Sequence, residues 1–359
     1  MPPKSAVDAF SPAIEHARRQ LIPLRWRTWV RLAVLGLATG ELGSMGSCNM
    51  TGGFHIPPST GGGRTDQLFA TLPKIPPHLG LGPIQFVVLV TTLVLLLLLL
   101  GLVGIYVASV SRFILFESVL TGQYHLRQSW RRWQPQGARL FVFNLVLGLI
   151  AMTVMMLAIG VPVLLAVMYG LWRRGQALGP LIAYIVLMVM AMFAFVLVFL
   201  LVHVLTKDFV VPQMAFEGLG PMAGWRRLLT MMDRERGGYA GYIGLKVVLA
   251  MASAILFGII GFIVMLMFAL PVIIVVVIGV IAIPGPGTWI WNPYTLTLAV
   301  IVGSVALGAL MFVIALVYAP ATAFFTAYPM HFFAARYPPL SAVLYPPSAA
   351  PLAPPVPAG

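Results

Sequence analysis

Long apolar segments constrain this chain more than any other feature. Residues 85–110 form one such segment, in which Leu95 to Leu100 are six consecutive leucines. A transmembrane helix needs about 20 mostly apolar residues, so this segment is long enough to cross a bilayer. Over the whole chain 9% of residues are charged, against about 25% in soluble domains. The sequence therefore predicts an all-α integral membrane protein whose outer surface faces lipid.

Six segments are expected to be transmembrane helices of one bundle, within residues 27–337. Their approximate bounds are 27–46, 84–111, 139–171, 179–206, 243–283 and 294–327. The first is the shortest and either spans or re-enters; we favour spanning, because the alternative would translocate the basic N-terminal residues. The third and the fifth exceed the length that a core of about 30 Å requires, so a kink or an end is expected at Pro162 and at Pro271.

The segments outside the spans differ in character. Residues 1–26 form a basic amphipathic segment, which is expected to rest at the headgroup level. Its apolar residues recur at steps of three and four: Val7, Phe10, Ile14, Ala17 and Leu21. The loop after the first span is rich in Gly and Pro. Residues 338–359 are proline-rich and are expected to form an extended, disordered tail.

Positive charge is distributed unevenly between the two predicted sides of the membrane. Eighteen of the 22 Lys and Arg residues lie on the side of the termini, and the others are Arg64, Lys74, Arg173 and Arg174. Because positive residues stay inside, both termini are predicted to be cytoplasmic, in a cell inner membrane. The net charge of +13 lies in short segments between apolar runs, not on one folded basic face. It therefore indicates topology and contact with anionic lipid, and no nucleic acid is expected.

Two of the predicted cytoplasmic loops resemble each other. Each begins with a charged residue and a Phe, and each has a Trp-Arg-Arg triplet 17 or 16 residues after that Phe. The triplets are Trp130, Arg131 and Arg132 in one loop, and Trp225, Arg226 and Arg227 in the other. Tryptophan suits the headgroup region and arginine contacts lipid phosphates, so both triplets are candidate lipid-contact sites. The matched order of features predicts an internal repeat. The alternative is that each triplet simply anchors a loop at the membrane.

These features resemble a known family of uncharacterised bacterial membrane proteins, which are related to the membrane domain of glycerophosphoryl diester phosphodiesterases. The resembling features are an N-terminal Ala9-Phe10-Ser11 stretch, the Gly-rich first loop, both Trp-Arg-Arg loops and the Arg336-Tyr337-Pro338-Pro339-Leu340 exit. In the fused enzymes of that family, catalysis belongs to a separate soluble barrel. Such a barrel needs about 250 residues, which the segment after the last span does not provide. The resemblance therefore implies a membrane domain without hydrolase activity.

Residues that carry catalytic or metal chemistry are sparse. The six His residues and the single Cys48 show no metal-ligand spacing, and no nucleophile, zinc or nucleotide motif is present. We therefore predict no enzyme, no catalytic residue, no metal and no cofactor. Asn144 and His203 are the main candidates for a functional polar residue within the spans. The alternatives are that Asn144 bonds a neighbouring helix and that His203 lies at the interface.

The leading functional hypothesis is a non-catalytic scaffold or accessory subunit that contacts anionic lipid. The runner-up is a transporter or channel subunit, and the third is a membrane-embedded enzyme. Small residues recur every four positions at Ala250, Ala254 and Gly258, where helices can approach closely. This stripe favours packing within the bundle over a homodimer face, so a second copy or another membrane protein is kept as a possible partner.

Overall fold

The computed structural model describes residues 3, 5–22, 25–40, 83–168, 178–282 and 293–346. This part of the chain is helical and contains no strand, which confirms the predicted all-α fold. The helices are α1 (Phe10–Leu21), α2 (Trp26–Ala38), α5 (Pro83–Thr121), α6 (Leu126–Met168), α7 (Leu178–Leu205), the π-helical turn η2 (Thr206–Val210), α8 (Val211–Glu217), α9 (Pro221–Arg234), α10 (Arg236–Ala282), α11 (Pro293–Ala334) and α12 (Pro338–Leu344).

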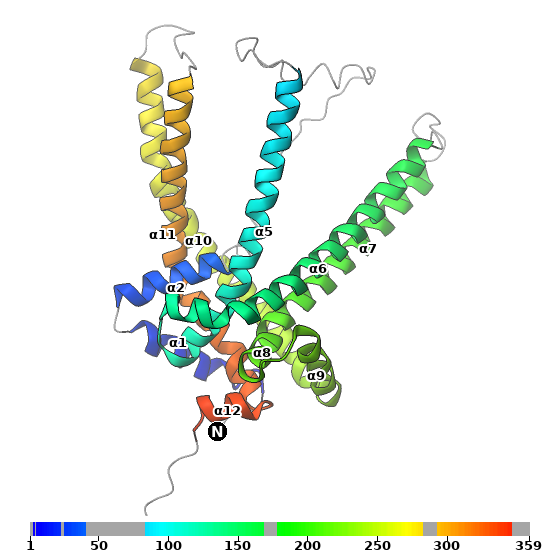
Figure 1. Ribbon diagram of the computed structural model, residues 1–359, viewed down its shortest axis with the longest axis vertical. Helices are drawn as coiled ribbons and strands as arrows, with labels where there is room; N and C mark the ends of the chain where they lie inside the picture. The colour runs from blue at the N-terminus through cyan, green and yellow to red at the C-terminus, as the bar shows by residue number, and fades with distance from the viewer. Residues whose placement is uncertain are drawn as a thin grey trace, which may run out of the picture.

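The molecule consists of long arms that rise from a compact helical base (Figure 1). We call residues 3–39, 109–140, 205–242 and 315–346 the base, because every buried residue of the described chain lies there. The arms are the remaining parts of α5, α6, α7, α10 and α11. Their side chains are largely exposed: the six consecutive leucines of α5 have exposed fractions between 50% and 62%. Within the described residues five helices are long and apolar enough to cross a membrane, and lipid is the medium that suits such a surface.

The excess length of two predicted spans is explained by the base. Helix α6 has 43 residues and α10 has 47, so they measure about 64 and 70 Å at 1.5 Å per residue. A membrane core takes about 30 Å of that length. The first turns of both helices belong to the base, which uses much of the remainder. Pro162 and Pro271 lie inside these helices. Of the two predicted effects of these prolines, a kink or an end, the end is therefore wrong.

Helix α2 differs from the first predicted span. It has 13 residues, about 20 Å, and is not among the five helices that can cross a membrane. It lies across the base and packs against α11 and α5 (Figure 1). Its Leu32 and Leu35 are buried, and Gly36 allows close approach to Thr322 of α11. Helix α2 itself is therefore not the span that was predicted over 27–46. Residues 41–46 of that prediction lie outside the described residues.

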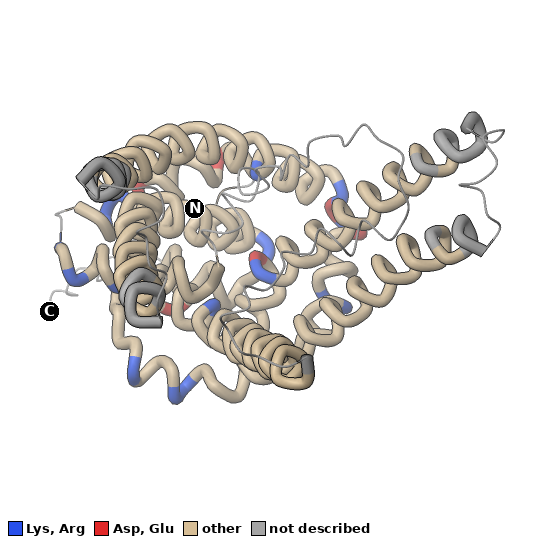
Figure 2. Tube along the Cα trace, turned by 90° about the horizontal axis from the view of Figure 1, so that it is seen from above, with Lys and Arg blue, Asp and Glu red and all other residues tan. Residues whose placement is uncertain are grey.

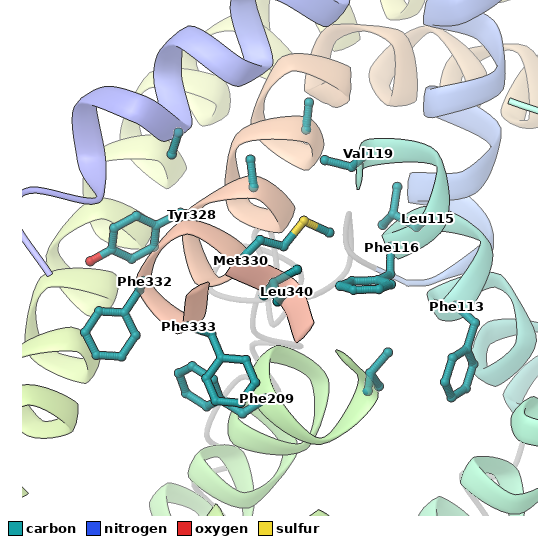
Figure 3. Close-up of a cluster of buried hydrophobic side chains, with 14 of the residues drawn as sticks. Phe113, Leu115, Phe116, Val119, Phe209, Tyr328, Met330, Phe332, Phe333 and Leu340 are labelled. Carbon is teal, nitrogen blue, oxygen red and sulfur yellow. The ribbon is translucent and has the colours of Figure 1, made fainter. Parts of the chain in front are cut away.

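The core of the base is aromatic. Phe209 of η2 lies between Tyr242 of α10, at 5.1 Å between ring centroids, and Phe333 of α11, at 5.2 Å. Figure 3 shows Phe333 directed towards Phe209, and Met330 directed towards the α5 side of the core. Phe209 and Phe333 are 0% exposed. Burying one such side chain contributes about 1.5–3 kcal/mol, so this cluster holds the ends of three long helices together.

The C-terminal exit is ordered, which corrects the prediction of a disordered tail from Pro338. Helix α12 begins at Pro338, where a proline suits the first turn, and its Leu340 is fully buried. Arg336 is bonded to Glu235, with Nε to Oε2 at 2.8 Å, and its guanidinium lies 4.0 Å from the ring centre of Phe332. Tertiary contacts of this kind override the composition of a short proline-rich segment. Residues 347–359 lie outside the described residues.

Candidate functional site

The first Trp-Arg-Arg triplet lies on the first turns of α6 and packs against α5. Trp130 is half-buried and contacts Tyr106 edge to face, with the ring centroids 6.4 Å apart. Arg132 forms an ion pair with Glu117 at 2.8 Å, and the indole N–H of Trp133 donates to the same carboxylate at 2.6 Å. Arg131 is exposed. The triplet therefore contacts the turn between two long helices, and although both arginines are exposed, only Arg132 has an ionic partner within the described chain.

The second triplet lies on α9 and has an equivalent arrangement. The indole N–H of Trp225 donates to Thr206 Oγ1 at 3.0 Å, on the turn that follows α7. Arg227 pairs with Glu217 at 2.5 Å, and the hydroxyl of Tyr337 donates to that carboxylate at 2.7 Å. Arg226 is exposed. The two triplets differ in one respect, because α9 is a separate helix whereas the first triplet belongs to a helix that continues into an arm.

A third arginine pair follows the same rule on α1. Arg19 pairs with Glu15 at 2.9 Å, while Arg18 is exposed. In each of the three Arg-Arg pairs that the structure describes, the second arginine is bonded to a glutamate, and within the described chain the first has no ionic partner. The glutamates precede their partners by 4, 15 and 10 residues, so no single spacing rule separates the two members of a pair. Figure 2 shows the basic residues gathered among the helices of the base, and in the described part of the arms Lys246, just above the base, is the one Lys or Arg residue.

Asn144 and His203 do not form a shared polar site. The amide of Asn144 donates to Ser109 Oγ at 3.3 Å, which joins α6 to α5. Nε2 of His203 lies 2.9 Å from a guanidinium nitrogen of Arg112, which joins α7 to α5. Because arginine only donates hydrogen bonds, Nε2 of His203 accepts this one and carries no proton. Each residue therefore bonds a neighbouring helix. For Asn144 this was the alternative to a functional role.

Asp208 is a charged residue that is buried in the base. It lies on η2, and its side chain is 0% exposed. It accepts a hydrogen bond from the hydroxyl of Tyr242 at 2.9 Å and pairs with the ammonium of Lys246, both on α10. A π-helical turn is rare and often marks a functional or strained position. Tyr242 and Lys246 are four residues apart in the sequence, but nothing local connects them with Asp208.

Two histidines from opposite ends of the chain meet at the outer face of the base. The rings of His16 and His331 are edge to face with centroids 5.3 Å apart. His331 Nδ1 lies 2.7 Å from the hydroxyl of Tyr345, and His16 Nε2 lies 2.8 Å from the carbonyl oxygen of Val119. Their sequence separation hides this contact from any spacing rule. In the described residues no group of three or more His, Cys, Asp or Glu residues is placed to hold a metal ion.

The five apolar arms and the folded, charged base define a multi-pass helical membrane protein with its base at one end. The chain belongs to a family of unknown function, DUF7544, whose profile matches residues 4–343. No curated protein and no solved structure matches it. The family's uncharacterised status agrees with the resemblance drawn from the sequence, but a relation to glycerophosphoryl diester phosphodiesterases is not shown.

Proposed function

We propose that this protein is a non-catalytic accessory or scaffold protein of the cell inner membrane, whose base lies on the cytoplasmic side and binds anionic phospholipid. The observation that supports this most directly is that only one arginine of each pair is bonded to a glutamate. Arg18, Arg131 and Arg226 are exposed and have no ionic partner within the described chain, while their neighbours, also at least partly exposed, each pair with a glutamate. An exposed guanidinium near a membrane finds its partner in a lipid phosphate.

The position of these arginines fits a membrane surface. The arms begin directly above the base, so the base lies where the spans meet the headgroups (Figure 1). A basic residue near an anionic surface contributes about 1 kcal/mol of binding. The net charge of +13 acts in the same direction, because it attracts the whole base to a negative leaflet.

A transporter or channel subunit is the second candidate, and Asp208 is the residue on which such a role would depend. Buried charges at the foot of membrane helices are expensive and often belong to ion or proton pathways. Here Tyr242 and Lys246 bind the carboxylate, and a cavity of about 30 Å³ beside it is lined by Arg112 and Lys207. A volume of that size admits about one water molecule. The cluster therefore supports a closed structural junction more than a solute path.

The test compares two double variants. Arg131→Gln/Arg226→Gln removes the exposed arginines, and Arg132→Gln/Arg227→Gln is the matched control that removes equal charge from the paired ones. The proteins are reconstituted in nanodiscs of mixed phosphatidylglycerol and phosphatidylcholine, and the lipids that remain after mild detergent extraction are quantified. We expect the first variant to lose about 30-fold in affinity for phosphatidylglycerol, from about 1 kcal/mol per residue.

The control should retain phosphatidylglycerol but unfold at a lower temperature, because it breaks the two glutamate pairs. Equal retention of phosphatidylglycerol by the wild type and by Arg131→Gln/Arg226→Gln would refute the proposal. In that case the arginines act as topology signals alone.

A further inference from the structure

An apolar groove lies where α1 and α2 meet the α10–α11 pair. Its volume is about 610 Å³, within the range of small-molecule sites. Phe10 and Ile14 of α1, Trp29 of α2, Leu256 of α10 and Phe324 of α11 line it, together with Arg18. The groove is built from two pairs of consecutive helices that come from opposite ends of the chain, and it contains none of the Trp-Arg-Arg residues of α6 and α9.

Helix α1 is oriented so that its larger apolar residues face this groove and not the protein core. Ala9 and Ala13 are 0% exposed and pack against α11, whereas Phe10 is 37% exposed and Ile14 is 44% exposed. Near its start the helix therefore buries Ala13 and leaves the larger Phe10 and Ile14 open, although Leu21 in its last turn is buried. Each Å² of apolar surface left in water costs about 25 cal/mol, so this arrangement is favourable only when another apolar group covers the groove.

The level of the groove in the molecule indicates what covers it. Its α10 wall, from Leu249 to Phe257, belongs to a membrane-spanning helix, and so does its α11 wall, from Pro320 to Phe325. Its floor is the amphipathic helix α1, of the kind that lies in the plane of the interface. The groove thus adjoins the acyl region on one side and the headgroup region on the other.

Charge at the groove narrows the choice of occupant. Arg18 lines it and is exposed, and within the described chain it has no ionic partner, because Glu15 is bonded to Arg19. No acidic residue lines the groove. The occupant should therefore combine a long apolar part with an anionic head, which is the chemistry of a membrane phospholipid and not that of an uncharged helix.

We propose that this groove binds one anionic phospholipid, with an acyl chain along Phe10, Ile14 and Leu256 and its phosphate on Arg18. The proposal rests on the proposed function for the preference for anionic lipid, but it assigns a separate, stoichiometric site. A tightly held lipid here would join the two helices of the N-terminus to the α10–α11 pair.

Native mass spectrometry of the full chain from phosphatidylglycerol and phosphatidylcholine nanodiscs tests the site. The wild type should retain one phospholipid after detergent exchange. Ala252→Phe, which fills the groove from α10, should retain none. Ile14→Gln changes only an exposed side chain and provides a second variant, for which weakened retention is expected. Arg18→Gln should keep the lipid but lose about 5-fold in preference for phosphatidylglycerol, while Arg19→Gln, the matched control, keeps that preference.

The outcomes separate this site from the general lipid contact. Loss of the single lipid in Ala252→Phe, with unchanged phosphatidylglycerol enrichment through Arg131 and Arg226, supports the groove. Retention of that lipid by both Ala252→Phe and Ile14→Gln overturns it. A dimer that disappears in Ala252→Phe would also overturn it, because the occupant would then be a second copy of the chain. If Arg131→Gln/Arg226→Gln removes enrichment but keeps the single lipid, the groove stands independently.

Discussion

The carboxylate of Asp208 accepts a hydrogen bond of 2.9 Å from the hydroxyl of Tyr242 and thereby joins η2 to α10 in the centre of the base. Lys246 lies one turn further along α10 and pairs with the same oxygen. The rings of Tyr242 and Tyr328 stack with centroids 5.3 Å apart, which connects this junction to α11. One buried carboxylate therefore sets the relative position of three long helices where their arms begin.

Removing that carboxylate should destabilise the base. Asp208→Ala leaves the ammonium of Lys246, 13% exposed, beside Tyr242 without its counter-ion. Loss of one partner from a buried ion pair costs about 3–5 kcal/mol. We expect a clearly lower unfolding temperature in detergent. Asp208→Asn/Lys246→Met removes both charges and should recover most of the loss; an unfolding temperature as low as that of Asp208→Ala would argue against a mainly electrostatic cost.

The crossing of α2 over α11 should depend on Gly36. A Cβ at this position would lie 3.0 Å from Oγ1 of Thr322, so a larger side chain forces the helices apart. Gly36→Leu should cost about 1–3 kcal/mol, as overpacking does. Gly36→Ala should be milder, and Thr322→Ala should compensate for it. Gly104→Ala is the control, because nothing lies within 4 Å of that site. A double-mutant cycle read by thermal unfolding that shows no coupling between 36 and 322 would contradict this contact.

Arg336 should not be replaceable by lysine. Its guanidinium reaches both oxygens of Glu235, at 2.8 and 2.5 Å, donates to the carbonyl of Phe332 at 2.9 Å and lies over that ring. Lysine keeps the charge but loses the planar fork and the stacking. We expect Arg336→Lys to free α12, which limited proteolysis should detect as faster cleavage near Pro338. Arg234→Lys, at an exposed position, provides the control and should not change the cleavage rate.

Alkaline pH should weaken the contact between α1 and the α5–α6 turn. The hydroxyl of Tyr124 donates to Gln20 Oε1 at 3.0 Å, and burial raises its pKa from 10.0 to about 12. The folded state thus holds the phenolic proton more tightly than the unfolded state. Its contribution to stability is complete below pH 10 and is lost as the pH rises through 12. Unfolding measured from pH 9 to 12 should therefore be less pH-dependent in Tyr124→Phe; an identical slope would exclude this residue as a cause.

The proposed orientation can be tested at exposed turns of the base. Gln123 and Ala223 are both exposed, so cysteines introduced there in a Cys48→Ser background should be reactive once the membrane is opened. With the base in the cytoplasm, an impermeant thiol reagent should label neither site in intact cells. Labelling from outside would reverse the orientation and place the exposed arginines at the opposite leaflet.

The sequence by itself determined the class of this protein. Long apolar runs are a local property, and the bilayer accepts them only as helices, so the all-α membrane fold and five of the spans could be predicted without tertiary information. The concentration of Lys and Arg in the segments of the base could be predicted equally well, because a charge inside the bilayer is costly; Lys246 lies only just above the base.

Tertiary structure decided the rest, because the deciding contacts join residues that are far apart in the chain. Whether Arg131 or Arg132 is free depends on Glu117 of another helix, and the burial of Asp208 depends on Tyr242 and Lys246 of α10. The basic N-terminal residues favoured a span that included α2, but 13 residues packed on α11 form a helix of the base instead. The proline-rich exit folds because Arg336 and Leu340 find partners in that base. A sequence pattern indicates whether each segment prefers water or lipid. Only the folded base determines which side chains contact one another.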